Sequence, residues 1–308
     1  MMNTRSALFY LVLFSFIGCQ SGQTNKTSQA TIKKETNPIS KNNQFNKYWY
    51  SGKAELNSYT LKQARYGEIR EGEVVLVFVT EPFSVSKQVK LDNPQKAGTD
   101  AVSVMKLNHV RKFNTGIYDY AIITSTFTPI NTKKYPFTLK SSTSIQEWCG
   151  HTFTQLNLAD DTYNFKQFSY FEADGDEEKT INATYLEEAL FTKIRIAKGQ
   201  LPEGEINLIP STIYSRFNYK KMDVEKAKIS KTTSEKTLNY KIKYLSINRT
   251  LTIGVEKNFP YKILNWTEDN GTGLLTTAKL KASSTEPYWK QKKVSDQDKR
   301  KALKLKYE

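Results

Sequence analysis

The chain has 308 residues, of which 38% are hydrophobic and 12% aromatic, and its formal net charge at pH 7 is +15. This composition supports a packed core, and the many Tyr and Phe residues favour strands. A strong positive charge is typical of nucleic-acid-binding proteins. The chain has no helical basic region and no RNA-binding aromatic motif, so we expect no nucleic-acid partner.

The first segment of the chain predicts export. A short positive segment, Met1–Arg5, precedes an apolar run, Ala7–Gly18, which is too short to span a bilayer and is typical of a secretory signal. The run ends in Phe16-Ile17-Gly18-Cys19, which resembles the lipobox of bacterial lipoproteins, although Phe16 stands where Leu is usual. We therefore expect residues 1–18 to be a lipoprotein signal peptide and Cys19 to be lipidated. A plain signal peptide with an incidental cysteine is the alternative.

Lipidation of Cys19 and the residues after it predict how the protein is anchored and which compartment it faces. Two or more acyl chains, such as palmitate, anchor a protein stably, so we expect a lipid-anchored membrane protein of the cell envelope. Residues Gln20–Asn25 lack the acidic cluster that accompanies surface display in Bacteroidota-type lipoproteins, which favours a periplasm-facing protein, on the outer membrane rather than the inner. Residues 19–46 are rich in Ser, Thr, Asn, Gln and Lys and predict a disordered tether.

Strand patterns begin soon after the expected tether. One strand is expected over Ala54–Arg65. The run Val74–Val79 is apolar without alternation, which predicts a central strand with both faces covered. Two further strands are expected, one around Tyr118–Ile122 and one over Phe165–Glu172.

One segment, residues 184–194, has the periodicity of an amphipathic helix. Its apolar residues at helical spacing share one face, and Asn182 or Thr184 is placed to cap its start. The residues on that face are Leu186, Ala189, Leu190 and Ile194.

The C-terminal half has the clearest strand alternation. It predicts a four-stranded antiparallel meander with one apolar face and one Lys/Thr face, over residues 238–244, 251–255, 261–267 and 274–282. The predicted fold class is therefore mainly β, with α+β as a possibility. We expect curved antiparallel sheets, two in number and half-barrel or sandwich-like, with the single helix packed across them.

These patterns define one β-rich folded domain over residues 47–290. Possible sub-lobes lie at 47–197 and 198–290, and a basic C-terminal tail follows at 291–308. If Cys19 is lipidated, Cys149 is the only remaining thiol, so no intramolecular disulfide is expected.

The densest group of reactive residues is Glu147-Trp148-Cys149-Gly150-His151. On a strand, Glu147, Cys149 and His151 would share a face, as a thiolate with its base and an orienting acid or as part of a metal site. Zinc needs three or four ligands, and the only other histidine is His109, so we expect no metal and no cofactor. The alternative is structural, with Trp148 packed and Gly150 relieving a tight spot.

Aromatic clusters mark both ends of the expected domain. Trp49 and Trp289 lie in Tyr48-Trp49-Tyr50 and Tyr288-Trp289-Lys290, and together with Trp148 they are candidates for binding a sugar or lipid. The alternative is that they join the first and last strands. Asp174-Gly175-Asp176 has some features of a calcium loop, but its spacing does not fit an EF-hand, so a solvated turn is expected.

Several segments together resemble a family of lipoproteins from flavobacteria and their relatives, over nearly the whole mature chain. They are Tyr48–Glu55, Gln63–Glu68, Val79–Phe83, Gln146–His151 and Pro287–Gln291. Members of that family are often labelled septum formation inhibitor Maf. The chain lacks the Ser-x-Ser-Pro-Arg-Arg type loop of the Maf nucleotide pyrophosphatases, so the resemblance implies no catalytic residues. The C-terminal meander also resembles periplasmic lipid-handling half-barrels of the lipoprotein-carrier type.

The leading functional hypothesis is a non-catalytic, lipid-anchored envelope protein that binds an amphiphilic ligand or an envelope partner protein. One alternative is an envelope hydrolase that uses Glu147, Cys149 and His151. The other is a structural subunit of an outer-membrane assembly. The sequence leaves the identity of the ligand or partner and the oligomeric state open.

Overall fold

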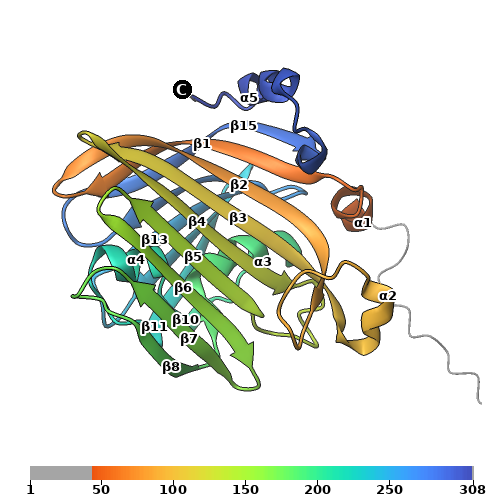
Figure 1. Cartoon of the computed structure of the whole chain (residues 1–308), viewed down its shortest axis with the longest axis horizontal. Coiled ribbons are helices and arrows are strands. Elements are labelled where there is room, and N and C mark those ends of the chain that lie inside the picture. The colour runs from red at the N-terminus through yellow and green to blue at the C-terminus, as the bar shows by residue number, and fades with distance from the viewer. Residues whose placement is uncertain (1–43, 307–308) are drawn as a thin grey trace, which may run out of the picture. The chain divides into compact units, whose positions relative to one another are not determined.

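The computed structural model describes residues 44–306, so the expected signal peptide, Cys19 and nearly all of the expected tether lie outside the described residues (Figure 1). The strands are β1 Ala54–Arg65, β2 Glu68–Ser84, β3 Ala101–Thr115, β4 Tyr118–Pro129, β5 Lys140–Glu147, β6 Gly150–Ala159, β7 Thr162–Ser169, β8 Glu177–Asn182, β9 Tyr185–Leu186, β10 Gly204–Ile209, β11 Glu225–Thr233, β12 Thr237–Tyr244, β13 Thr250–Glu256, β14 Ile263–Asp269 and β15 Leu275–Glu286. The helices are α1 Gln44–Trp49, α2 Pro94–Ala97, α3 Leu190–Ile196, α4 Thr212–Phe217 and α5 Asp298–Ala302.

The mainly β fold class is confirmed, but the strands form one sheet, not the two that were expected. The sheet has 15 strands in the order β8-β7-β6-β5-β4-β3-β2-β1-β15-β14-β13-β12-β11-β10-β9. It is continuous because β1 pairs antiparallel with β2 on one side and with β15 on the other. The predicted C-terminal meander is confirmed as β12 to β15, which pair in sequence order.

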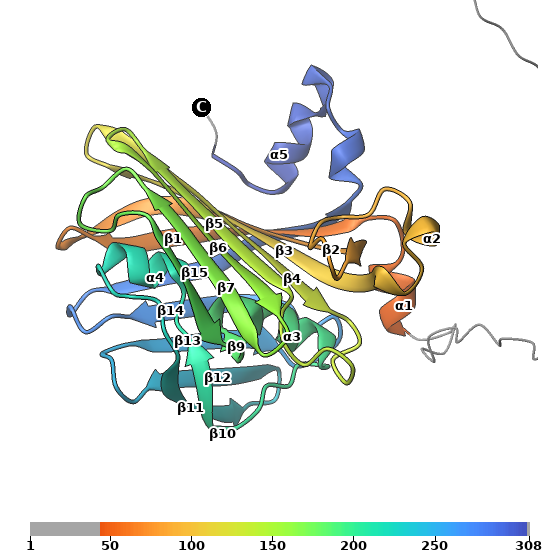
Figure 2. The ribbon, with the colours of Figure 1, turned by 60° about the horizontal axis from the view of Figure 1, so that its bottom comes forward.

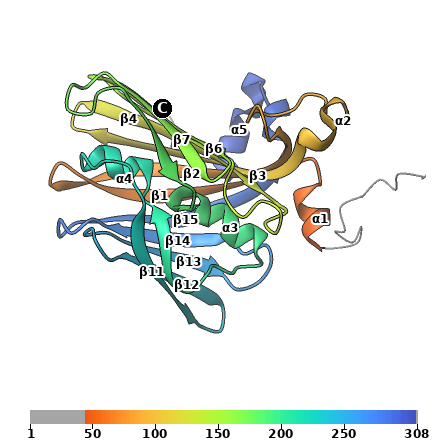
Figure 3. The same ribbon diagram turned by 90° about the horizontal axis from the view of Figure 1, so that it is seen from below.

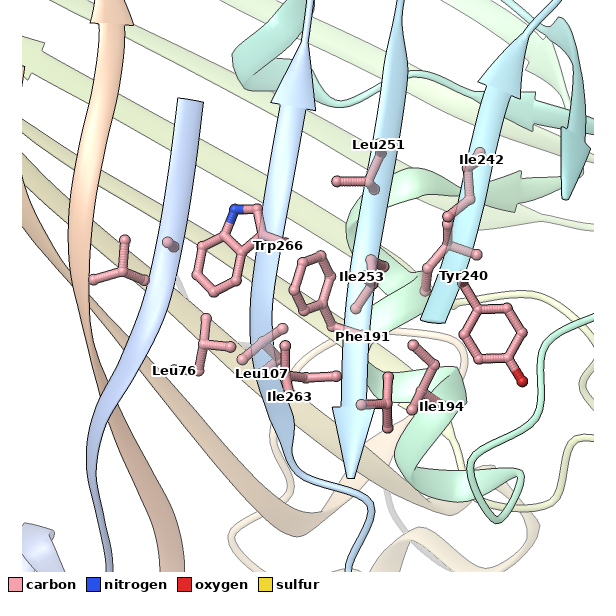
Figure 4. Close-up of a cluster of buried hydrophobic side chains, with 14 of the residues drawn as sticks. Leu76, Leu107, Phe191, Ile194, Tyr240, Ile242, Leu251, Ile253, Ile263 and Trp266 are labelled. Atoms are coloured by element: carbon pink, nitrogen blue, oxygen red, sulfur yellow. The ribbon is translucent and has the colours of Figure 1, made fainter. Parts of the chain in front are cut away.

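The sheet curves into two wings, one running from β8 to β2 and the other from β15 to β9 in the strand order, and α3 lies between them (Figures 2 and 3). Side chains of α3 and of both wings fill the space between them. Figure 4 shows Phe191 and Ile194 of α3 among inward residues of β12, β13 and β14, and the Phe191 and Trp266 rings meet edge to face with centroids 5.5 Å apart. Trp266 also meets Tyr59 of β1, at 4.9 Å. The middle of the sheet is therefore joined to the helix by a packed apolar core.

The predicted helix over 184–194 begins later than its periodicity suggested. Tyr185 and Leu186 form β9, which pairs in parallel with Leu208 and Ile209 of β10, and a 3₁₀ turn precedes α3. The Thr184 hydroxyl donates to the Asn207 carbonyl, 2.7 Å away, instead of capping the helix. The pairing of β9 with β10 therefore satisfies backbone hydrogen bonds at the position where a helix cap was expected. The four residues of the predicted apolar face are all buried.

The prediction that both faces of Val74–Val79 are covered is confirmed. Val74, Leu76 and Phe78 of β2 face the main core. The outward face of the same strand packs against the C-terminal segment, where Leu303 is buried in one cluster with Val77. The segment after β15 therefore folds back over the sheet, and α5 lies beside β1 and β15 (Figure 1).

The two edges of the sheet, β8 and β9, are consecutive in the chain. They are not hydrogen-bonded to each other in the strand order, but a second apolar cluster joins the two wings there. It contains Leu156, Tyr163, Phe165, Ile181, Leu186, Ala189, Ile209 and Met222. Closure of the wrapped sheet is thus achieved by side chains. Among the helices of residues 44–306, none is long and apolar enough to cross a membrane.

Candidate functional site

The predicted reactive group lies at a hairpin turn and not along one strand. β5 ends at Glu147 and β6 begins at Gly150, so Trp148 and Cys149 form the turn between them. Glu147 is opposite Gly150, and His151 is opposite Gln146. The expectation that Glu147, Cys149 and His151 share a strand face is therefore wrong, because the chain reverses between them.

The same hairpin borders an open depression of about 620 Å³. The turn and strand ends contribute most of its lining, and the loop after β7 contributes Tyr170. The lining residues are Gln146, Glu147, Cys149, Gly150, His151 and Tyr170. A Cβ atom on Gly150 would lie 2.5 Å from Cδ1 of Tyr170, so glycine allows Tyr170 to lie against the hairpin. This matches the expected role of Gly150 in relieving a tight spot.

Trp148, at the tip of this turn, is exposed rather than packed. Its side chain is 68% exposed, although tryptophan is highly buried on average. The indole Nε1–H donates to Oδ1 of Asp119 in β4, 2.8 Å away, which fixes the ring position. Trp148 therefore presents a held aromatic ring at the tip of the turn, and its chain neighbours Glu147 and Cys149 line the depression. The expected structural packing of Trp148 is contradicted.

The chemistry of Cys149 does not favour a nucleophile. The Cys149 backbone N–H donates to Oε2 of Glu147, at 2.7 Å, which places the carboxylate beside the exposed thiol. A side-chain hydrogen bond from the thiol to the Glu147 carboxylate, together with the negative charge of that carboxylate, raises the pKa of the Cys149 thiol. A catalytic cysteine requires the opposite shift, because the thiolate is the reactive form. Among the interactions of the described residues, no hydrogen bond or ion pair joins His151 to Cys149 or Glu147.

Two arginines lie close to the β5–β6 turn. Arg65 donates to the Phe217 carbonyl at 3.0 Å, and its guanidinium carbon lies 4.2 Å from the centre of the Phe217 ring. Arg216 lies over the Phe171 ring, at 4.5 Å, and its Nε is 3.0 Å from Oδ2 of Asp174. Both arginines line a narrow gap that Glu147 and Gly150 also border.

The acidic loop after β7 is packed rather than fully solvated. The Asp174 carboxylate takes part in the pair with Arg216 and accepts a hydrogen bond from the Ser169 hydroxyl at 3.3 Å. The Asp176 carboxylate accepts from the Ser169 N–H at 2.9 Å. Across residues 44–306, no group of three or more His, Cys, Asp or Glu side chains is arranged to hold a metal ion. The loop is thus held by its own hydrogen bonds and by Arg216.

The other two candidate tryptophans have different surroundings. Trp49 is buried against Tyr48 and Phe78, with the Arg195 guanidinium 5.0 Å from its ring centre. Trp289 is partly exposed and meets the ring of its neighbour Tyr288. In the part of the chain that the structure describes, no ring contact joins Trp49 and Trp289. Trp49 precedes β1 and Trp289 follows β15, and these two strands pair, but the two tryptophan rings do not meet.

The interior contains a network of buried charged side chains that the sequence did not indicate. Arg111 donates to Glu268 at 2.6 Å, and Arg249 lies 3.6 Å from the same carboxylate and donates to Glu187 at 2.5 Å. Burial alone would raise the pKa of Glu268, but Arg111 and Arg249 lower it to about 2. Arg111 of β3, Glu268 of β14, Arg249 just before β13 and Glu187 of the 3₁₀ turn before α3 are far apart in the sequence and meet in the folded interior.

A second buried pair joins α3 to the first strand. The side chains of Arg195 and Glu55 are both 0% exposed, and Nη2 of Arg195 lies 2.6 Å from Oε2 of Glu55. Burial opposes ionisation of Glu55, yet Arg195 holds the pKa of the carboxyl below its ordinary value. The Tyr48 hydroxyl also donates to Glu55, at 2.5 Å. This pair positions α3 against β1.

Three further buried groups have shifted pKa values. Burial raises the pKa of Glu188 to about 7 and lowers that of Lys193 to about 8. Burial and the nearby Arg111 lower the pKa of His109 to about 3, so this imidazole is neutral at neutral pH. None of the three lines the depression at the β5–β6 turn. They belong to the packed interior and not to the surface site.

Comparisons with known proteins give little further information. No family model matches the chain, and no curated protein matches it. Among solved structures, the chain is similar to a β-barrel-like protein of the domain of unknown function DUF1849 from Brucella abortus, with 11% sequence identity and a TM-score of 0.43. The match covers 75% of this chain and 96% of that chain.

Proposed function

We propose that the chain is a lipid-anchored protein of the cell envelope that has no catalytic activity and binds an amphiphilic ligand at its surface, in the depression beside Trp148. The observation that carries the proposal is the exposed Trp148 ring, which Asp119 holds in place. Tryptophan offers an apolar face with a polar edge and is enriched at interfaces, where one end of the ring is apolar and the other wet.

The composition of the depression supports an amphiphilic ligand. Tyr170 supplies aromatic surface in its lining, and Gln146, Glu147 and His151 supply hydrogen-bonding groups. Trp148 is not part of that lining, but its exposed ring lies at the tip of the same turn. The space between the wings contains the packed core around α3, which supports binding outside the sheet. An envelope partner protein that covers the same surface is the second candidate, because the packed interior leaves the surface as the place of contact.

The alternative of a hydrolase has less support. It requires Cys149 as a thiolate with His151 as its base. The adjacent Glu147 raises the thiol pKa, and the hairpin places His151 opposite Gln146. The reactive form of the thiol is therefore disfavoured at neutral pH.

Native mass spectrometry of full-length protein extracted from membranes tests the proposed site. We expect a stoichiometric amphiphile on the wild-type protein and on Trp289→Ala, the matched control, and at least about tenfold less on Trp148→Ala because the stacking surface is lost. A bound protein of defined mass, lost in Trp148→Ala, would support the partner alternative instead. Wild-type protein with neither a ligand nor a partner would contradict the proposal.

The lipid anchor is tested separately, by growing cells with an alkyne analogue of palmitate. We expect labelling of the wild-type chain and of Cys149→Ser, and none of Cys19→Ser, because the acyl chain would be attached to Cys19. A wild-type chain that stays unlabelled and fractionates as a soluble cytoplasmic protein would refute the anchor and the proposed location.

A further inference from the structure

The outward faces of β11 and β12 carry lysines at adjacent positions. On both strands the residues that alternate with these lysines, such as Ile229 and Ile242, are buried in the core. In the strand register, Lys228 is directly opposite Lys243. The four lysines of this face, all exposed, are Lys226, Lys228, Lys241 and Lys243. With about 6.6–6.8 Å between alternate residues of a strand and about 5 Å between strands, their ammonium groups share a small area.

Neighbouring groups do not neutralise these lysines. Within residues 44–306, none of the four takes part in an ion pair. Glu205 of β10 is opposite Lys228 in register, but no ion pair forms between them. Lys231, farther along β11, does pair with Glu203, at 2.6 Å. Like charges directly opposite each other destabilise a sheet, so the Lys228–Lys243 pair destabilises the isolated fold, and a bound anion would offset this effect.

The rest of this face indicates which anion it would meet. Thr250 and Thr252 of β13 are opposite Lys243 and Lys241 and continue the polar surface. The outward row of β12 ends in Leu245, which is half exposed beside Lys226. A flat polar face with lysines and one exposed leucine suits a lipid headgroup layer, in which the leucine can enter the apolar boundary. A soluble anionic polymer would leave that leucine in water.

We propose that the outward face of β11 and β12 docks on an anionic phospholipid surface through Lys226, Lys228, Lys241 and Lys243, with Leu245 at the bilayer boundary. Near such a surface each lysine strengthens binding by about fivefold, and the attraction weakens with salt. This docking is a second contact, separate from the ligand site at Trp148 and from acylation of Cys19. It goes beyond the proposed function and does not require it.

Vesicle co-sedimentation tests the docking face. The protein is the chain from Gln20 onward, which contains the whole described unit and lacks the acylated cysteine. The vesicles are either phosphatidylglycerol with phosphatidylcholine in equal parts, or phosphatidylcholine alone. We expect binding to the anionic vesicles only, at 50 mM salt, and a loss of at least about thirtyfold when the four lysines are replaced by Gln. Circular dichroism confirms that each variant is folded.

A charge-matched variant provides the control. Lys87, Lys90, Lys96 and Lys133 are also exposed but lie on other elements, and replacing all four by Gln removes the same total charge. We expect this control to bind within about threefold of wild type, and Leu245→Ser to bind about threefold to tenfold more weakly. Equal losses in the two quadruple variants would show a non-specific net-charge effect and overturn the proposal. So would binding of soluble polyphosphate but not of vesicles, which would identify an anionic polymer as the partner, or no vesicle binding at all.

Discussion

At the β5–β6 turn, the effect of one carboxylate on one thiol decides what chemistry is available. The Cys149 side chain is accessible, and accessibility is one of the two conditions for a reactive cysteine. The other condition is a lowered pKa, and Glu147 shifts the pKa in the opposite direction. The local sequence that suggested a nucleophile thus also contains the group that suppresses it.

The reactivity of Cys149 provides the first prediction. Iodoacetamide should label wild-type Cys149 at pH 7.5 no faster than it labels the thiol of the urea-denatured chain, because Glu147 disfavours the thiolate. Glu147→Gln should speed labelling several-fold, and His151→Gln should leave the rate unchanged. If iodoacetamide labelled the folded wild-type protein much faster than the denatured chain, the hydrolase alternative would be supported.

Glu188 is a buried acid whose ionisation is unfavourable in the folded protein. One of its oxygens accepts hydrogen bonds from the N–H and the hydroxyl of Thr212, both at 2.6 Å, while Oε2 has no hydrogen-bond partner within the described structure. The folded-state pKa of about 7 lies above the ordinary value of 4.5. The folded protein therefore binds this proton more tightly than the unfolded chain. The stabilisation is complete below about pH 4.5 and is lost as the pH rises through 7.

The second prediction concerns this pH dependence. Glu188→Gln keeps the side chain neutral, so its stability relative to wild type should rise by roughly 2–3 kcal/mol between pH 4.5 and 8. Urea denaturation of both proteins across that range measures the difference, in which the contributions of His109 and other groups cancel. Parallel stability curves for the two proteins would contradict the assigned pKa.

At the scale of elements, α3 is held by packing and by one buried charge pair. Phe191 and Ile194 contact the sheet, and Arg195 reaches Glu55 of β1. A buried pair loses hydration on both sides, so its net contribution to stability is small, whereas loss of one partner leaves an uncompensated charge in the core. The pair therefore fixes the position of α3 more than it adds stability.

The third prediction separates these two effects. Glu55→Gln should destabilise the fold by about 3–5 kcal/mol, and Glu55→Leu combined with Arg195→Met should recover most of that loss. The exposed pair Lys166–Glu178, whose Nζ–Oε1 distance is 3.0 Å, is the matched control. Glu178→Gln should cost less than about 1 kcal/mol in the same urea titration. A double variant as unstable as Glu55→Gln would contradict the interpretation.

At the scale of the whole described unit, both ends of residues 44–306 pack against the central strands of the sheet. Trp49 of α1 packs in the core, and Leu303 covers the outward face of β1 and β2, where Ala54, Leu56 and Val77 are buried. The Ser58 hydroxyl donates to the Leu303 carbonyl at 2.5 Å. The basic C-terminal segment is therefore part of the fold, as the outer layer over two central strands.

The fourth prediction tests this outer layer. Leu303 is 8% exposed and Val294, in the same segment, is 81% exposed. Leu303→Ala should lower the free energy of unfolding by about 2 kcal/mol because it leaves a gap over β1 and β2, whereas Val294→Ala should change it by less than about 0.5 kcal/mol. Hydrogen exchange of β2 amides should rise in Leu303→Ala alone. Equal stability of the two variants would show that the C-terminal segment does not stabilise the sheet by packing over β1 and β2.

The candidate site was predictable in part. The sequence drew attention to Glu147–His151 by residue type, and five of its lining residues lie in Gln146–His151. Tyr170 could not be found in this way, because it lies beyond β7 and only the pairing of β6 with β7 brings it next to His151 and Gly150. The shared strand face of Glu147, Cys149 and His151 was wrong, because a two-residue turn reverses the chain and nothing in that segment is a strong turn signal.

The sequence by itself determined β1, the middle of β2, parts of β4 and β7, and the meander β12 to β15, because the pattern of apolar and polar residues along a strand is a local property. It also determined that the middle of β2 is covered on both faces, since the successive residues Val74–Val79 are all apolar. It did not indicate several other strands, including β3, β10 and β11. Only the tertiary structure decided that the strands form one wrapped sheet, that Arg195 meets Glu55, and that four lysines share a face. These depend on register and curvature, which bring residues 140 positions apart into contact and which no local pattern specifies.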